Sequence, residues 1–221
     1  VFSFANRLIV TTTDKWSSMA DKALANQTIS VEKLRFQDLA DSPIDWSQFS
    51  LTNVNDIKLK KKNDVRPHQE KAIADVLSGF QRADRGKLIM ACGTGKTFTS
   101  LRLMEGQVSA NGRVLFLAPS ISLVGQSLRA WTAQALNPFH AFVVCSDSKV
   151  GRDEEDISTH DLAYPATTDA KRLAKVASVL SKDRRTVVFS TYQSIQVVAD
   201  AQQAGFGAFD LIKIGKASCR E

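Results

Sequence analysis

One short segment of the chain has residue types and spacing suited to holding a row of phosphates. Residues 93–97 read Gly-Thr-Gly-Lys-Thr and are followed by a helical pattern. Backbone N–H groups at a helix N-terminus attract anions, and glycine allows their close approach and the left-handed angles of such a turn. In such loops the lysine bridges the terminal phosphates of a nucleoside triphosphate, and the next hydroxyl ligates Mg²⁺. The predicted phosphate-binding residues are Gly93, Thr94, Gly95, Lys96 and Thr97, with Lys96 and Thr97 as catalytic candidates and Thr97 as the metal ligand.

The residues around this loop predict the elements that position it. A strand over 87–90 should lead into the loop and a helix over 96–109 should leave it. Elsewhere apolar runs alternate with amphipathic helical patterns, which is typical of βαβ units. We therefore predict an α/β fold, with a mostly parallel sheet flanked by helices on both faces. The other expected strands are 113–118, 140–146, 185–190 and 209–214; the other expected helices are 67–81, 121–136, 169–181 and 192–204, with a polar loop at 147–168.

A polar segment over 50–63, SLTNVNDIKLKKKN, divides the chain, and we expect a linker there. Before it, a strand-like run at 7–13 and a helical pattern capped by Ser17 contain too little apolar sequence for an independent core. We therefore expect residues 1–49 to be the last part of one domain and 64–221 to form the larger domain. The linker lysines are interpreted as a solvated connector or, alternatively, as contacts to a DNA backbone: Lys58, Lys60, Lys61 and Lys62.

Composition narrows the class of protein only a little. The net charge of +6 suits a polyanionic partner, although globular proteins without such a partner are often as basic. Three scattered cysteines and the absence of a zinc-type spacing favour a reducing cytoplasm. No apolar run approaches the roughly 20 residues that span a bilayer, so no membrane partner is expected. Because the chain begins at Val1 without an initiator methionine or signal peptide, we expect it to belong to a longer protein.

The loop and the residues upstream of it resemble superfamily 2 helicases and translocases. MACGTGKT (90–97) resembles the P-loop of that superfamily and differs from its frequent form only at Cys92, whose alkylation should therefore disturb nucleotide binding. Met90 stands where the strict Walker A form has glycine. VRPHQEKAI (65–73) resembles the adenine-reading motif, which implies Arg66 and Gln69 as cofactor-binding residues. An amide can accept from adenine N6 and donate to N7.

Two further stretches resemble the DNA-contacting motifs of the same superfamily. LFLAPSISLVGQ (115–126) resembles motif Ia, and VVFSTYQSI (187–195) resembles motif Ib. Both follow predicted strands at their carboxyl ends, where α/β proteins place ligands. A strand–turn–helix with a serine cap is the alternative reading of the first stretch. The resemblance implies DNA-backbone contacts at Ser120, Gln126, Thr191 and Ser194, and a RecA-like P-loop domain.

The acidic pair expected after the last strand is missing. In superfamily 2 an aspartate positions Mg²⁺ and a glutamate polarises the attacking water. Here Gly215 and Lys216 occupy those places, and Lys213 stands in a strand that should be apolar. We therefore predict weak ATP binding and negligible hydrolysis by this chain, with the domain truncated at motif II.

The chain also resembles the single-chain type ISP restriction–modification enzymes, which place an Mrr-like nuclease domain before the motor. LIVTTTDKWSSMADKAL and SPIDW resemble the end of that nuclease domain, without its cutting residues, and CSDSKVG to YPATTD resembles the motor. The resemblance implies the first RecA-like domain of an ATP-dependent DNA translocase that binds ATP and Mg²⁺, acts on double-stranded DNA and works with a second RecA-like domain. Two alternatives stay open: an RNA helicase, and a nucleotide-binding interaction module without motor activity.

Overall fold

A computed structural model describes residues 7–12, 17–25, 31–40, 42–145, 166–180 and 183–215. The chain divides into two compact units, with the boundary between Lys60 and Lys61. Among the described residues, no helix combines the length and the apolar character needed to cross a membrane.

Unit 1 is a small α/β segment. It contains β1 (Arg7–Thr11), α1 (Ser18–Ala25), β2 (Val31–Arg35), α2 (Phe36–Ala40) and the 3₁₀ turn η1 (Trp46–Gln48). The two strands pair in parallel. As predicted, 7–13 contains a strand, and the Ser17 hydroxyl accepts a hydrogen bond from the Ala20 N–H (3.2 Å) at the start of α1. Leu8 and Val10 of β1 are 61% and 62% exposed, so one face of this sheet buries little apolar surface.

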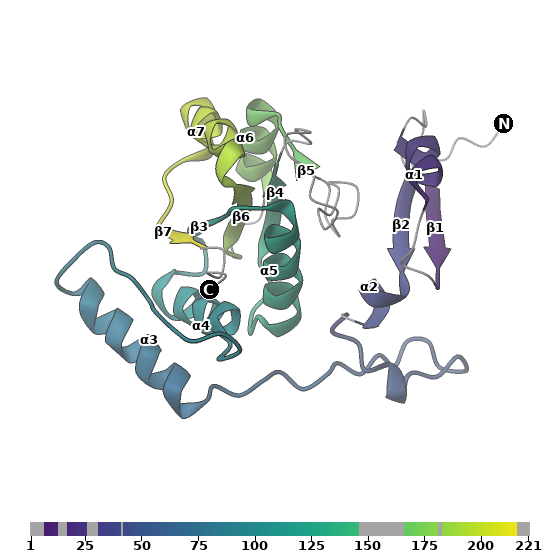
Figure 1. Cartoon of the computed structure of the whole chain (residues 1–221), viewed down its shortest axis with the longest axis horizontal. Coiled ribbons are helices and arrows are strands. Elements are labelled where there is room, and N and C mark those ends of the chain that lie inside the picture. The colour runs from purple at the N-terminus through teal and green to yellow at the C-terminus, as the bar shows by residue number, and fades with distance from the viewer. Residues whose placement is uncertain are drawn as a thin grey trace. The chain divides into compact units, whose positions relative to one another are not determined.

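Unit 2 contains a five-stranded parallel sheet in the order β5-β4-β6-β3-β7 (Figure 1). The α/β prediction is confirmed, and most elements begin and end close to the predicted residues. The elements of unit 2 are α3 (Pro67–Phe80), α4 (Lys96–Gln107), β3 (Arg113–Ala118), α5 (Ile121–Gln134), β4 (His140–Val144), β5 (Ala166–Thr167), α6 (Ala170–Val179), β6 (Thr186–Thr191), η3 (Tyr192–Ser194), α7 (Ile195–Ala201), η4 (Gln202–Phe206) and β7 (Leu211–Ile214).

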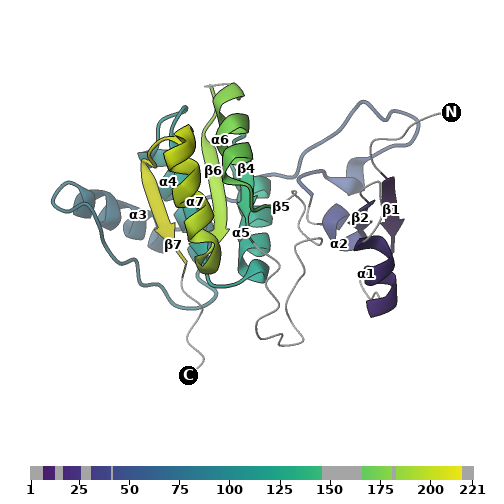
Figure 2. The ribbon, with the colours of Figure 1, turned by 90° about the horizontal axis from the view of Figure 1, so that it is seen from above.

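Helices cover both faces of this sheet, as the view from above in Figure 2 shows. On one face, α6, α7 and η4 bury a cluster that includes Leu117, Val188 and Phe206. On the other face, the ring of Trp131 from α5 packs edge-on against Phe116, with 5.3 Å between ring centroids. Trp131 is fully buried and is therefore a core residue.

Two predicted elements differ in the structure. The predicted strand at 87–90 is not a strand: these residues pair with no neighbour, and Ile89 is 88% exposed. An apolar run predicts burial, but a strand also needs an edge to bond with, and this run makes no ladder. The predicted helix at 192–204 is divided into η3, α7 and η4, and η4 contains Gly205 at φ 102°.

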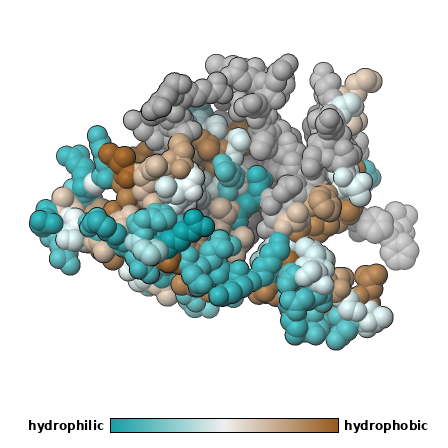
Figure 3. Space-filling model, turned by 60° about the horizontal axis from the view of Figure 1, so that its bottom comes forward, coloured by the Kyte–Doolittle hydropathy of each residue, from teal (hydrophilic) through white to brown (hydrophobic). Residues whose placement is uncertain are grey.

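Some predictions fall on residues that the structure describes only in part. Most of the predicted polar loop at 147–168 lies outside the described residues, and its last residues form the short strand β5. Lys216 also lies outside them. Among the residues that are coloured in Figure 3, hydrophilic ones form a continuous area and hydrophobic ones appear as separate patches.

The linker lysines all have partners within their own unit. Lys58 pairs with Asp56 (2.8 Å), and Lys60 Nζ donates to the Ala40 carbonyl (2.6 Å). Lys61 pairs with Asp64 (3.2 Å), and Lys62 Nζ donates to the Ala135 carbonyl. The linker is therefore attached by these side chains to the segments on either side of it.

Candidate nucleotide-binding site

The glycine-framed loop has the backbone that the sequence predicts. Gly93 and Gly95 have φ angles of 75° and 83°, in the left-handed region that side chains disfavour. Gly95 is the N-cap of α4, and the Thr94 hydroxyl donates to the Ala91 carbonyl (2.7 Å) across the turn. The loop thus ends at the start of a twelve-residue helix, whose first N–H groups can face an anion.

Lys96 and Thr97 form the first turn of α4. The exposed Lys96 ammonium donates to the carbonyls of Met90 (3.3 Å) and Ala91 (3.0 Å), which keeps it over the loop. The Thr97 carbonyl accepts from the Trp131 indole N–H (3.1 Å), which fixes this turn to α5. The two catalytic candidates therefore lie together at the helix start.

Gln69 is held against the loop by both ends of its amide. Its Oε1 accepts from the Arg66 N–H (3.0 Å) at the start of α3, and its Nε2 donates to the Thr94 carbonyl (2.9 Å). Gln69 is 4% exposed. One lone pair on Oε1 and one hydrogen on Nε2 are left over, and these are the groups that adenine N6 and N7 require.

A cavity of about 520 Å³ joins the adenine-reading and phosphate-binding candidates. Arg66 and Gln69 line it together with Gly93 and Gly95, so residues separated by 26 positions in the sequence share one space. Sequence analysis did not name the remaining lining residues as site residues, although Val65 and Pro67 belong to the segment 65–73 that resembles the adenine-reading motif. They are Asn63, Asp64, Val65, Pro67 and Phe98.

The DNA-contact candidates lie at the carboxyl edge of the sheet. Ala118 of β3 is level with Thr191 of β6, so Ser120 and Thr191 follow neighbouring strand ends. The Ser120 hydroxyl accepts from the Leu123 N–H (3.3 Å) as the N-cap of α5, which is the alternative that its sequence allowed. Thr191 Oγ1 and Ser194 Oγ are 3.2 Å apart and hydrogen-bonded, and both residues are 2% exposed.

Burial separates these candidates into two kinds. In this conformation the side chains of Thr191 and Ser194 are buried, whereas Ser120 is partly exposed. Gln126 is exposed but lies in the second turn of α5, away from the strand ends.

At the end of β7, a glycine stands where the acidic pair is expected to begin. Gly215 donates its N–H to the Leu117 carbonyl (2.6 Å), and its own carbonyl accepts from the Tyr192 hydroxyl. The nearby Lys213 ammonium lies 4.1 Å from the centroid of the Phe116 ring, and burial lowers the pKa of Lys213 to about 8. This end of the strand therefore offers an amine in place of carboxylates.

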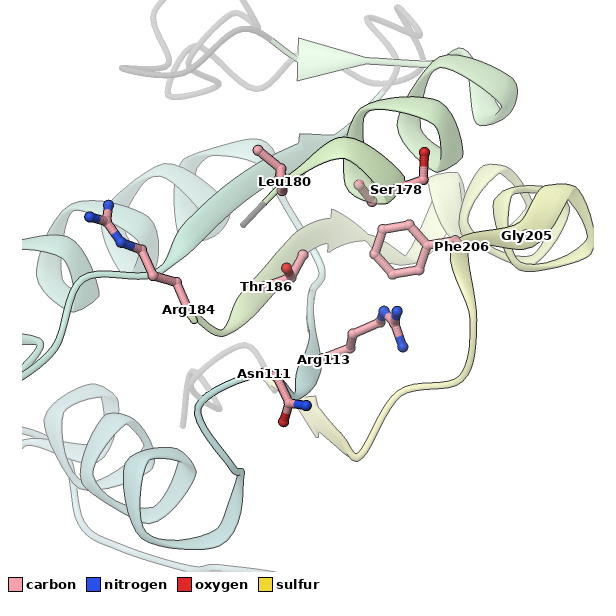
Figure 4. Close-up of a pocket in the computed structure, with 9 residues that line it drawn as sticks. Asn111, Arg113, Ser178, Leu180, Arg184, Thr186, Gly205 and Phe206 are labelled. Atoms are coloured by element: carbon pink, nitrogen blue, oxygen red, sulfur yellow. The ribbon is translucent and has the colours of Figure 1, made fainter. Parts of the chain in front are cut away.

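A second cavity, of about 380 Å³, involves none of the predicted site residues. It is lined by the first residues of β3 and β6, Arg113 and Thr186, so it lies at the amino edge of the sheet. Figure 4 shows the Arg113 guanidinium facing the Phe206 ring, with Cζ 5.9 Å from the ring centroid.

Comparison with known proteins matches both parts of the chain. A restriction endonuclease family matches residues 2–56, and the family described as Type III restriction enzyme, res subunit, matches residues 62–214. The helicase/translocase subunit XPB/SSL2 of the general transcription and DNA repair factor IIH from Saccharomyces cerevisiae (strain ATCC 204508 / S288c) is 28% identical over 134 residues, 57% of this chain and 15% of that protein. The probable helicase A859L of African swine fever virus (isolate Tick/Malawi/Lil 20-1/1983) is 28% identical over 138 residues, 61% of this chain and 14% of that protein.

Two solved structures are more similar. The ATP-dependent Type ISP restriction-modification enzyme LlaBIII bound to DNA is 39% identical, with a TM-score of 0.79, over 93% of this chain and 14% of that one. A nuclease-deletion mutant of the Type ISP enzyme LlaGI, in complex with a DNA substrate mimic, is also 39% identical, with a TM-score of 0.58, over 69% of this chain and 15% of that one. Both predicted resemblances, to superfamily 2 helicases and to type ISP restriction enzymes, are confirmed. The chain belongs to the family of the Type III restriction enzyme res subunit.

Proposed function

We propose that this chain is the nucleotide-binding part of an ATP-driven DNA translocase of the restriction–modification type. The observation that carries the proposal is the cavity in which Arg66 and Gln69 face Gly93 and Gly95. One end of that cavity suits an adenine and the other suits phosphates. The chain spans about one seventh of the relatives it matches, so the activity of the whole protein belongs to the proposal.

Each residue of the cavity has a role in this proposal. The α4 N-terminus and the N–H groups of 93–97 hold the phosphates, and Lys96 turns from the loop carbonyls to the terminal phosphates. The Thr97 hydroxyl ligates Mg²⁺, which neutralises charge on the phosphate oxygens when it is bound. Gln69 reads the adenine edge with the hydrogen and lone pair that its protein partners leave unused.

DNA binding is proposed at the carboxyl edge of the sheet. The two type ISP relatives are described in complex with DNA or a DNA substrate mimic. Ser120 and Gln126, with the backbone around Thr191 and Ser194, are the proposed contacts with a double-stranded DNA backbone. In the whole protein, a second RecA-like domain completes the motor. Binding of a DNA duplex should weaken in Ser120→Ala, whereas Thr191→Ala, whose hydroxyl is buried, should change it less.

ATP titration in the presence of Mg²⁺ tests nucleotide binding. Lys96→Ala should weaken ATP binding by about tenfold or more, since a charge-assisted contact to phosphate is lost. Lys87→Ala is the matched control, because Lys87 is an exposed lysine just before the loop and does not line the cavity. Equal ATP affinity in the Lys96→Ala variant and the unchanged chain would contradict the proposal.

A further inference from the structure

The carboxyl end of α5 contacts both walls of the nucleotide cavity. We name residues 134–136, Gln134, Ala135 and Leu136, the α5 hub. Gln134 and Ala135 are at least partly buried, and Leu136 is exposed. None of the three lines the cavity, so any effect of the hub on a nucleotide must act through the walls that it holds.

The first wall is the segment 63–67 that precedes Gln69. The Asn63 N–H donates to the Gln134 side-chain oxygen (2.8 Å), and Lys62 Nζ donates to the Ala135 carbonyl. These two contacts fix the chain on one side of the wall. The hydrogen bond from the Arg66 N–H to Gln69 Oε1 (3.0 Å) fixes it on the other side.

The second wall is the Phe98 ring on α4. The Arg102 guanidinium lies over this ring, with 4.5 Å from Cζ to the centroid, and pairs with Glu105 at 2.5 Å. The Arg102 and Glu105 side chains are only 9% and 8% exposed, so this ion pair is largely shielded from water. Glu105 also accepts from the Leu136 N–H (2.6 Å), which ties the second wall to the hub.

The two walls differ from the glycine loop in what they can offer a nucleotide. The loop and the α4 N-terminus supply N–H groups for phosphates. The walls supply Val65, Pro67 and the Phe98 ring, which are apolar surfaces suited to a base. A displacement of the walls should therefore weaken contacts with the base and leave the phosphate contacts intact.

We propose that Gln134 is a positioning residue for the nucleotide base, acting through the Asn63 N–H and the segment 63–67. The inference deepens the proposed nucleotide-binding function and rests on it. A side chain outside the cavity thereby controls how well the cavity distinguishes a nucleoside triphosphate from a bare chain of phosphates.

The test compares two ligands on three variants of the full chain. The ligands are ATP and inorganic tripolyphosphate, each titrated with Mg²⁺ by calorimetry. Gln134→Leu removes the acceptor, Gln134→Glu keeps an acceptor oxygen at the same position, and Gln107→Leu is the matched control at an exposed helix end. Thermal unfolding midpoints verify that each variant is folded.

Gln134→Leu should raise the Kd for ATP by about fivefold, the typical effect of one lost hydrogen bond. The Kd for tripolyphosphate should stay the same, and Gln134→Glu and Gln107→Leu should bind ATP like the unchanged chain. An unchanged ATP affinity in Gln134→Leu would overturn the inference. An equal loss of affinity for ATP and for tripolyphosphate would also overturn it, as would an ATP affinity in Gln134→Glu as low as that of Gln134→Leu. If the unchanged chain bound no ATP, the proposed function itself would fail, and the inference with it.

Discussion

The backbone of Gly95 lies directly against the Gln69 amide, so a side chain at position 95 would displace that amide. A Cβ at position 95 would lie 2.5 Å from Gln69 Nε2, and the backbone there has φ 83°. Glycine therefore serves two purposes in the same residue: it permits the turn, and it lets the amide reach the Thr94 carbonyl.

Gly95→Ala should destabilise the protein by about 1–3 kcal/mol, because it combines left-handed strain with a steric clash. It should also weaken ATP binding by displacing Gln69. Gly106→Ala is the control: Gly106 lies inside α4 with open space around its Cα, so this change should stabilise by about 0.5–1 kcal/mol. Urea unfolding of both variants measures the difference, and equal stabilities would contradict the clash.

A second prediction at the residue scale concerns the reactivity of the cysteines. Cys92 is exposed inside the loop, and Cys145 is buried. Alkylation with N-ethylmaleimide should therefore modify Cys92 much faster than Cys145 and reduce ATP affinity, because Cys92 precedes Gly93, which lines the cavity. Cys92→Ser should bind ATP with an affinity that the reagent leaves unchanged. Unaltered affinity after complete modification of Cys92 would refute this prediction.

At the residue scale, the sequence was informative where chemistry demands particular residue types. Gly93, Gly95 and Gln69 lie together in the structure as their motifs predict. The hub residue Gln134 could not be predicted, because a glutamine at a helix end is ordinary and its partner Asn63 is 71 positions away. The roles of the predicted site residues in ATP and DNA binding remain predictions.

At the scale of elements, apolar pattern identified strands that are buried and paired. Residues 113–118 form a strand with the predicted bounds, and five of its six residues are buried, as their apolar side chains predict. The run 87–90 has a similar composition but no pairing partner, and burial cannot follow from composition alone. The order β5-β4-β6-β3-β7 was also beyond prediction, because nothing local specifies which strands are neighbours.

The strand β7 carries a titratable group that should make stability depend on pH. Burial lowers the pKa of Lys213 from 10.5 to about 8, so between pH 8 and 10.5 the unfolded chain binds more protons than the folded one. The free energy of unfolding should therefore rise with pH across this window. Below pH 8 the buried ammonium is charged in the folded protein, which then bears the full cost of its burial.

Lys213→Met should abolish this part of the pH dependence and stabilise the protein at pH 7 by about 1–2 kcal/mol. Urea unfolding of both proteins at pH 7, 8, 9 and 10 gives the free energy of unfolding as a function of pH. Subtracting one curve from the other cancels the contributions of the titratable groups that both proteins share. Parallel curves for the two proteins would show that the ammonium is solvated in the folded state.

On the scale of the whole molecule, two families match the parts of the chain on either side of the linker. The restriction endonuclease match ends at residue 56, and the res subunit match begins at residue 62. From the composition shift we expect a linker over 50–63, because polar segments without periodicity seldom enter a core. Along the sequence, the boundary between the two compact units falls between Lys60 and Lys61.

ATP turnover by the chain should be negligible, with or without DNA. Gly215 and Lys216 stand where a metal-positioning aspartate and a water-polarising glutamate are expected, so binding should not lead to hydrolysis. Phosphate release measured with excess duplex DNA tests this, and robust DNA-stimulated turnover would contradict it. In Gly215→Asp with Lys216→Glu, slow turnover should appear if these two positions are what limits the reaction.

The indole of Trp131 can provide an optical signal from beside the phosphate-binding loop. Its N–H donates to the Thr97 carbonyl, so it is hydrogen-bonded to the first turn of the helix that we propose holds the phosphates. The ring is fully buried, whereas Trp46, the other tryptophan in the described part of the chain, is 39% exposed. A small movement of Thr97 changes the polarity around one shielded fluorophore, and an exposed quencher such as iodide suppresses the emission of Trp46. The emission of Trp131 should therefore report binding of the proposed nucleotide without an attached label.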